Sequence, residues 1–329
     1  MSPTSSCATT SSPPTHLVVS FPTTTRTKKL HMQIKQILVP TDFSENAQHA
    51  LSYAVELAKQ CSAKVHLLHT PVVPTYLLMD LSYSPGPEAV TRILNDSQDA
   101  LDEQAKDIAA AGVEYFTAIR EGTVHEVIRD YAKEHDVDLV IVGTHGRTGV
   151  SKLMYGSVTE RVLKTVHTPI IVVPPEGGEL PSSIVIAYDF SAPAKRAAEI
   201  ARAIHGVCHG PLHMVHSYLD VWGEYTDRGA VVGEAAEKRR EALHLGLEEM
   251  LQAEAKELFS IDAQTIQTHL VTGDPAEGLI TVAQDVGATL ICAGTTGKSG
   301  IERLLIGSVA RRLLHDSKIP LLLAHDDAP

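Results

Sequence analysis

The chain has 329 residues, of which 43% are hydrophobic and 21% are charged, so it is long enough for two globular domains of ordinary size. Its formal net charge of −12 argues against binding to nucleic acid or to an anionic membrane surface. No apolar run reaches the roughly 18 residues that a bilayer-spanning helix needs. The four cysteines lack the spacing of a disulfide framework, which indicates a reduced, cytoplasmic compartment.

Residues 1–31 are rich in serine, threonine and proline and contain no acidic residue. This composition is typical of a disordered tail, and it also fits a start codon that lies upstream of a true first residue at Met32. A targeting peptide is the alternative, because transit peptides are also rich in serine and poor in acidic residues. The predicted domains therefore begin after this segment.

From residue 36 onwards, short apolar runs alternate with segments of helical periodicity. The apolar runs predict β-strands at 37–39, 65–69, 113–119, 139–142 and 170–173. Between them we expect helices that begin at Ser44 and that cover 88–111, 124–134 and 157–166. Several prolines predict a loop over 70–87. Strands that alternate with helices indicate a parallel sheet with helices on both faces.

The second half of the chain repeats the first. Asp189-Phe190-Ser191 matches Asp42-Phe43-Ser44 at an offset of 189 − 42 = 147 residues. After a four-residue insertion the offset becomes 151, as between Gly143 and Gly294. A duplication of this length predicts two copies of one domain, at 32–175 and 182–326, joined by a linker at 176–181. The predicted fold class is therefore α/β, with two tandem open parallel sheets, each of five strands flanked by helices.

A glycine-rich segment follows the fourth predicted strand of each copy. Gly143–Ser157 and Gly294–Ser308 both read G-x2-G-x9-G-S, and each leads into a helix. Glycine lets the backbone approach a ligand closely, and a helix N-terminus attracts anions through its N–H groups and its dipole. Two segments with identical spacing predict a phosphate-binding loop in each copy. The alternative is that these glycines only form turns.

Asp42 and Asp189 directly follow the first strand of each copy. Parallel sheets bind ligands at the carboxyl ends of their strands, near the point where the strand order reverses. We therefore expect each aspartate to share one crevice with the glycine loop of its own copy. The aspartates, or the neighbouring Ser44 and Ser191, could instead cap the next helix. Because capping and ligand binding can coexist, the sequence leaves both roles open.

These motifs resemble the universal stress protein family, in its ATP-binding form with two tandem domains, over about 35–174 and 182–325. The resemblance implies a Rossmann-like sheet of the adenine nucleotide alpha hydrolase type. It also implies that ATP, with or without Mg²⁺, binds to both copies. The residues that it assigns to the nucleotide are Thr41, Asp42, Gly143, Gly146, Gly156, Ser157 and Val158 in the first copy, and Tyr188, Asp189, Gly294, Gly297, Gly307, Ser308 and Val309 in the second.

Within this set, the resemblance implies that the aspartates contact adenine and ribose together with the backbone of Thr41 and Tyr188. The loops and their serines would hold the phosphates. The first copy departs from the family's pattern after Gly122, where the second copy has Asp274 and a proline. Tyr188 is also bulkier than Thr41, so the two pockets need not be equivalent.

Other chemistries fit less well. A P-loop reading of Gly294–Ser299 requires a glycine at position 292, which is Cys292. Zinc ligands must converge, but His213 and His216 would point to opposite faces of a strand. No catalytic or metal-binding residue is assigned, because no nucleophile–base pair or pair of carboxylates stands out.

We therefore expect a nucleotide-binding regulatory or stress-response protein without efficient chemistry. A slow Mg-dependent ATPase and an interaction scaffold that binds no nucleotide are the alternatives. The last strands, at 170–173 and 320–323, are apolar, and the edge of a sheet tends to find a partner. We expect these two strands to pair antiparallel within the chain. A further homo-oligomer and a protein partner are left open.

Overall fold

Residues 33–71, 86–144, 156–220, 233–259, 266–297 and 306–326 are described by the structure, which is a computed structural model. The expectations for residues 1–31, for most of the loop at 70–87 and for Gly146 lie outside these ranges. Within them, the order of helices and strands follows the internal repeat.

Ten strands of the described residues form one sheet, in the order β3-β2-β1-β4-β5-β10-β9-β6-β7-β8. The first copy supplies β1 (Gln36–Thr41), β2 (Lys64–His69), β3 (Tyr115–Ile119), β4 (Leu139–Gly143) and β5 (Ile170–Val173). The second copy supplies β6 (Ile184–Ala187), β7 (Leu212–Tyr218), β8 (Ile266–Thr272), β9 (Leu290–Gly294) and β10 (Leu321–Ala324). Neighbouring strands within each copy are parallel, which confirms the predicted fold class.

The two copies meet at a seam formed by β5 and β10, which pair antiparallel, as expected from the sequence. Ile171 lies opposite Leu322, and these residues are equivalent in the repeat, since 322 − 171 = 151. The flanking pair of Ile170 and Leu323 follows the same local symmetry. The predicted pair of five-stranded sheets is therefore one continuous ten-stranded sheet with a pseudo-two-fold axis at its centre.

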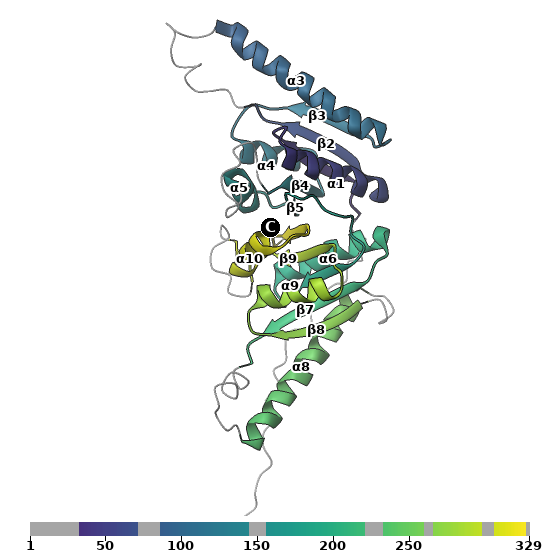
Figure 1. Ribbon diagram of the computed structural model, residues 1–329, viewed down its shortest axis with the longest axis vertical. Helices are drawn as coiled ribbons and strands as arrows, with labels where there is room; N and C mark the ends of the chain where they lie inside the picture. Colours follow the sequence, from purple (N-terminus) through teal and green to yellow (C-terminus); the bar gives the residue numbers. More distant parts are fainter. Residues whose placement is uncertain are drawn as a thin grey trace, which may run out of the picture. The chain divides into compact units, whose positions relative to one another are not determined.

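Helices pack on both faces of the sheet. One face carries α1 (Glu45–Cys61), α3 (Gly86–Ala110), α6 (Ala192–Cys208) and α8 (Glu234–Phe259). The other carries α4 (Val124–Glu134), α5 (Ser157–Thr165), α9 (Pro275–Asp285) and α10 (Ser308–Asp316). In Figure 1, α4 and α5 lie together on one side of the first five strands and α1 lies on the other. Each face of the sheet has its own hydrophobic core, because successive strand residues point to opposite faces. Ile37 and Val39 belong to one core and Leu38 to the other.

Several element boundaries agree with local chemistry. Ser44 caps α1 by accepting a hydrogen bond from Ala47 N (3.2 Å). The helix expected at 124–134 has these observed bounds. The strand expected from 113 begins at Tyr115 instead. The reason is that Val113 N still bonds Ile108 O (3.3 Å) at the end of α3, so this residue closes the helix rather than joining the sheet.

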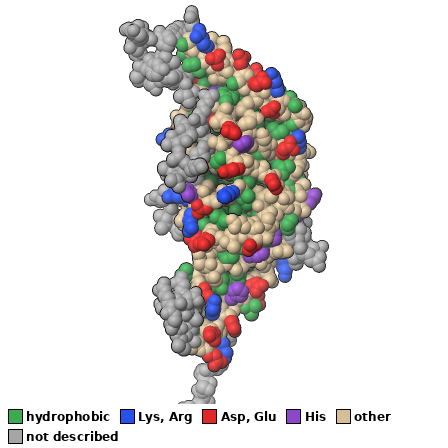
Figure 2. Space-filling view, viewed as in Figure 1, with side chains coloured by type: hydrophobic (Ala, Val, Ile, Leu, Met, Phe, Trp, Pro, Cys, Tyr) green, Lys and Arg blue, Asp and Glu red, His purple; other side chains and the backbone are tan. Residues whose placement is uncertain are grey.

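The molecular surface carries charges of both signs. Figure 2 shows acidic and basic side chains interspersed over the face in view. The chain has more acidic than basic residues, with a net charge of −12. On this face, however, the acidic side chains do not form one patch. None of the described helices has the length and apolar character needed to cross a bilayer.

Candidate functional site

A pocket of about 690 Å³ lies at the carboxyl ends of β1, β2 and β4. The strand order of the first copy reverses between β1 and β4, which is where doubly wound sheets bind ligands. The volume falls in the range of roughly 300–1,000 Å³ that is usual for small-molecule sites. The predicted site residues that line it are Thr41, Asp42, Gly143, Gly156 and Val158. The structure thus brings the aspartate and both ends of the glycine loop to one crevice.

Each aspartate forms a turn with the serine that follows two residues later. Asp42 Oδ1 accepts a hydrogen bond from Ser44 N (3.1 Å), and Asp189 Oδ1 accepts one from Ser191 N (3.0 Å). The serine hydroxyls, in turn, cap α1 and α6. The helix caps are therefore the serines, and the aspartates fix the approach to the helix.

The phenylalanine between each aspartate and serine has left-handed backbone. Its φ is 64° at Phe43 and 62° at Phe190. This conformation costs a bulky residue about 1–2 kcal/mol, and such strain gathers at functional sites. The ring of Phe43 lies 4.3 Å from that of His69, and Phe190 lies 4.9 Å from His216. Because both copies keep the same turn, it is a feature of the domain and not an accident of one site.

The same histidines support the end of the first strand in each copy. His69 Nδ1 lies 2.8 Å from Thr41 O, and His216 Nδ1 lies 2.7 Å from Tyr188 O. A carbonyl oxygen only accepts, so Nδ1 carries the proton in both rings. His69 and His216 are equivalent in the repeat, since 216 − 69 = 147, and this shared hydrogen bond to the backbone gives both the same structural role.

The side chains of Thr41 and Tyr188 point into the helix layer. Thr41 Oγ1 donates to Gln104 Oε1 in α3 (2.8 Å), and Tyr188 OH donates to Glu254 Oε2 in α8 (2.7 Å). Tyr188 is only 3% exposed, and burial together with this hydrogen bond raises its pKa. The extra bulk of Tyr188 is therefore accommodated in the core between β6 and α8.

The glycines at the start of each loop have a packing role. A Cβ atom on Gly143 would lie 2.6 Å from Asn46 O in α1, and one on Gly294 would lie 2.8 Å from Pro193 Cβ in α6. Their small size lets the first helix of each copy approach the end of the fourth strand. A Cβ atom on Gly297 would instead lie 2.7 Å from Asp189 Oδ2. In the second copy, therefore, the loop and the aspartate are also in contact.

Gly156 and Gly307 are the N-cap residues of α5 and α10, with φ of −56° and −58°. These angles suit any residue, so left-handed backbone does not explain the glycines. Glycine has no side-chain oxygen for the first-turn N–H groups, which leaves the N-terminus of each helix suited to an external anion. Val158 in the first turn of α5 is 45% exposed. At the start of α10, Ser308 is exposed and Val309 is half-buried.

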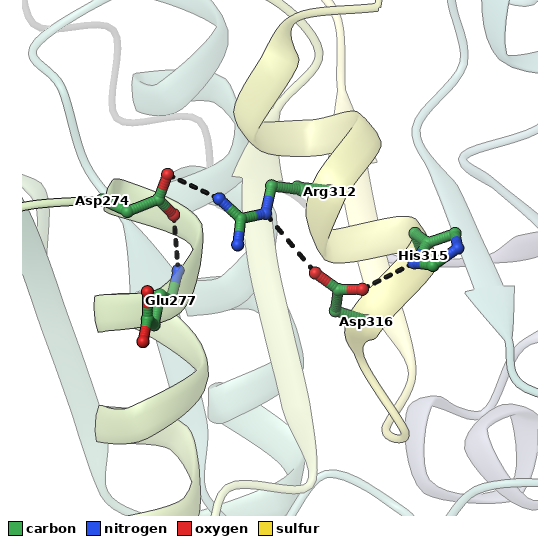
Figure 3. A network of polar contacts seen from close by, with 5 residues as sticks. All are labelled: Asp274, Glu277, Arg312, His315 and Asp316. Atoms are coloured by element: carbon green, nitrogen blue, oxygen red, sulfur yellow. Dashed lines mark hydrogen bonds and ion pairs between the residues drawn. The ribbon is translucent and has the colours of Figure 1, made fainter.

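In the second copy, a polar network ties α10 to α9 (Figure 3). Asp274 caps α9 by accepting from Glu277 N (3.0 Å), and its other oxygen lies 2.6 Å from Arg312 Nη1 in α10. Arg312 Nε also lies 3.5 Å from Asp316, which in turn contacts His315. The first copy has Thr123 at the equivalent N-cap, and its side chain makes no capping bond. Because Thr123 carries no charge, the first copy cannot form the counterpart of the Asp274–Arg312 ion pair.

Sequence reasoning missed part of the pocket wall. Further lining residues are His69 at the end of β2, Thr70 and Pro71 after it, Ile93, Asp96, Ser97 and Ala100 in α3, and Val124 and Ile128 in α4. His69 and Thr70 occupy the end of the second strand, so the rule that located Asp42 at the end of the first strand could have found them. The α3 residues belong to no motif, and only the fold brings them to the site.

Fold and site together define a tandem α/β protein of the doubly wound, Rossmann-like class. The chain belongs to the universal stress protein family, whose model matches it twice, at 33–174 and at 182–325. Universal stress protein MJ0531 of Methanocaldococcus jannaschii is 33% identical over 140 residues, which are 42% of this chain and 81% of that protein.

Other relatives extend over both copies. Universal stress protein Slr1230 of Synechocystis sp. is 23% identical over 309 residues, covering 88% of this chain and 99% of that protein. A solved universal stress protein from Archaeoglobus fulgidus aligns with a TM-score of 0.65 and 23% identity, covering 90% of this chain and 100% of that chain. The tandem fold is therefore shared with other members of the family.

Proposed function

We propose that the protein binds an adenine nucleotide, ATP, in each copy and has a regulatory role in a stress response without efficient chemistry. The observation that carries the proposal is the pocket at the strand-order reversal, which holds Asp42 and the two ends of the first glycine loop. Membership of the universal stress protein family supports the role in stress. The free thiols of Cys61, Cys208 and Cys292 suit a reduced compartment, so we place the protein in the cytoplasm.

The pocket wall suits a ligand that is partly apolar and partly anionic. Leu68, Ile93 and Val142 supply apolar surface for a base. The carboxylate of Asp42 can accept hydrogen bonds from ribose hydroxyls, and the amides at the start of α5 can donate to phosphate oxygens. In the second copy, the corresponding polar groups are Asp189, which lies beside Gly297, and the N-terminus of α10.

The charge of the pocket favours a nucleotide that carries Mg²⁺. The described lining residues include the carboxylates of Asp42 and Asp96 and no lysine or arginine. Mg²⁺ binds substrate phosphates and usually keeps several waters, so it can accompany ATP without a ligand from Asp42. Bound to ATP, it would offset part of the phosphate charge.

Identification of any nucleotide that co-purifies with the protein is the first test. Calorimetry with Mg-ATP should then give two sites per chain. Gly156→Leu and Gly307→Leu should each remove one site while the fold is kept. Gly246→Leu is the matched control, because a Cβ atom at this position in α8 meets nothing within 4 Å.

Three outcomes would count against the proposal. Unchanged stoichiometry in the double variant would show that the glycine loops are not the site. An absence of any nucleotide binding would favour the interaction scaffold. Phosphate release well above the rate of free Mg-ATP would favour the slow ATPase.

The domain boundaries at 32–175 and 182–326 are part of the same proposal.

A further inference from the structure

His325, which directly follows β10, contacts both copies across the seam. Its Nδ1 lies 3.0 Å from Thr295 Oγ1 in the second copy, and its Nε2 lies 2.8 Å from Leu163 O in α5 of the first copy. Because a carbonyl oxygen only accepts, Nε2 carries the proton, and Nδ1 accepts from the Thr295 hydroxyl. Burial lowers the pKa of His325, which favours this neutral form.

Thr295 connects His325 to the second glycine loop. It follows Gly294 and is only 1% exposed. Its carbonyl oxygen accepts a hydrogen bond from Gly307 N (2.7 Å), and its own N–H donates to Ala324 O (2.8 Å). A shift of Gly307 at the start of α10 would therefore move Thr295 through its carbonyl oxygen. It would also move His325, which is bonded to the Thr295 hydroxyl.

Leu163 connects His325 to the pocket of the first copy. It lies in the last turn of α5, where carbonyl oxygens have no partner within the helix. His325 thus caps α5 from the other copy, and its ring also lies edge-on to that of His167 at 5.4 Å. At the opposite end of this nine-residue helix, the N-cap residue Gly156 lines the pocket.

Among the described residues, the position equivalent to His325 in the first copy holds no histidine. The residue that corresponds to His325 is Pro174, since 325 − 151 = 174, and its ring can neither donate nor accept. The backbone contacts around Thr144, the counterpart of Thr295, are otherwise the same: Thr144 N donates to Val173 O (3.2 Å), and Gly156 N donates to Thr144 O (3.0 Å). At this position, therefore, the two halves of the seam differ by a histidine in place of a proline.

We propose that His325 is a positioning residue that couples the two candidate nucleotide sites. A nucleotide held at the N-terminus of α10 orders Gly307, Thr295 and His325, and this order is passed to the last turn of α5 in the first copy. Energetic coupling between distant sites is carried by packed side chains and hydrogen-bond networks of this kind. The inference rests on the proposed function, because it requires a nucleotide at the second glycine loop.

The test measures hydrogen–deuterium exchange with and without Mg-ATP in a chain whose first pocket is filled by Ala100→Trp. ATP then reaches only the second copy. We expect slower exchange at 290–312, and we also expect exchange at 157–167 to slow by about fivefold, at the lower end of known couplings between sites. His325→Leu should abolish the response at 157–167 and keep that at 290–312. His325→Gln should retain the response at 157–167, because the glutamine side chain offers both a donor and an acceptor.

Two further variants make the test specific. Thr295→Val removes only the hydroxyl that donates to His325 Nδ1. It should therefore abolish the response at 157–167 as His325→Leu does, and it tests the same link if His325→Leu folds poorly. His244→Leu replaces an exposed histidine of α8 and should change neither response. A persistent response at 157–167 in both His325→Leu and Thr295→Val would overturn the coupling.

The outcomes also separate the two proposals. In the Ala100→Trp chain, protection at 290–312 without any at 157–167 would refute the coupling and leave nucleotide binding intact. An absence of protection in both segments would refute nucleotide binding by the second copy and the coupling with it.

Discussion

Each copy holds its aspartate in place with a strained turn. The Asx hydrogen bond occupies Oδ1 of Asp189, and Oδ2 faces the loop at Gly297. The left-handed Phe190 between the aspartate and the serine makes this turn possible at a cost of about 1–2 kcal/mol. Because Phe43 repeats the conformation, the orientation of the carboxylate is retained in both copies.

Removal of the carboxylate should weaken binding at the base end of the site. We expect Asp42→Ala and Asp189→Ala each to lower affinity at their own copy by about 1–3 kcal/mol, the cost of a lost buried hydrogen bond. AMP and ATP should lose affinity alike, because the phosphates are bound elsewhere. Titration of each nucleotide by calorimetry measures this.

Asp42→Asn is the matched control, since its side-chain oxygen still accepts from Ser44 N and keeps the turn. Equal losses of nucleotide affinity in the alanine and asparagine variants would show that binding depends on the negative charge. A loss of affinity confined to the alanine variant would show that binding depends on the turn. A loss seen only with ATP would contradict the assignment and move these residues to the phosphate side.

The elements around the site differ in how far the sequence predicts them. The cap at Ser44 and the bounds of α4 follow from local chemistry, and the repeat locates both loops. The left-handed φ of Phe43 could not be predicted, because residue type argues against it. The contribution of Ala100 and Asp96 in α3 depends on tertiary packing. The resemblance assigned Gly143 to ligand contact, with a simple turn as the alternative, whereas its contact with α1 is visible only in three dimensions.

The two kinds of glycine in the loops should respond differently to a methyl group. Gly143→Ala places Cβ 2.6 Å from backbone in α1, so we expect a loss of stability of about 1–3 kcal/mol from overpacking. At Gly307 the nearest atom is Thr295 O at 3.2 Å, and Gly307→Ala should cost less. Urea denaturation of both variants measures the difference. Equal stabilities would contradict the packing role of Gly143.

For the whole molecule, buried histidines set the response to acid. Burial lowers the pKa of His66, His205, His213, His269 and His325. In the unfolded chain histidine titrates near about 6.5, so the unfolded state binds more protons below that pH. The stability they contribute is present above the unfolded pKa and is lost as pH falls toward the folded value.

We therefore expect a lower urea midpoint at pH 5.5 than at pH 7.5. His269→Gln should narrow this difference, because His269 faces His213 at 3.1 Å and both rings resist protonation. Replacement of the exposed His244 by glutamine is the control and should leave the difference unchanged. A midpoint that is constant or higher at pH 5.5 would contradict the expectation.

The seam predicts how the separated halves behave. β5 and β10 are buried along their whole length, and separation would expose an apolar edge with unpaired backbone groups. We expect 32–176 or 180–329, expressed alone, to form homodimers or to aggregate. In the intact chain the tether instead gives the partner strand an effective concentration of roughly millimolar. Sedimentation of each half measures its oligomeric state. Two monomeric halves that do not associate when mixed would refute the prediction.

The fused seam also changes what evolution can do with the protein. In a symmetric dimer of identical chains, every substitution appears on both sides of the axis and must suit both. Here Ile171 faces Leu322, and His325 stands where its counterpart is Pro174. A mutation can therefore alter one half while the other keeps its original residue. Duplication within one chain thus opens a division of labour, in which one site can specialise while the other preserves the ancestral task.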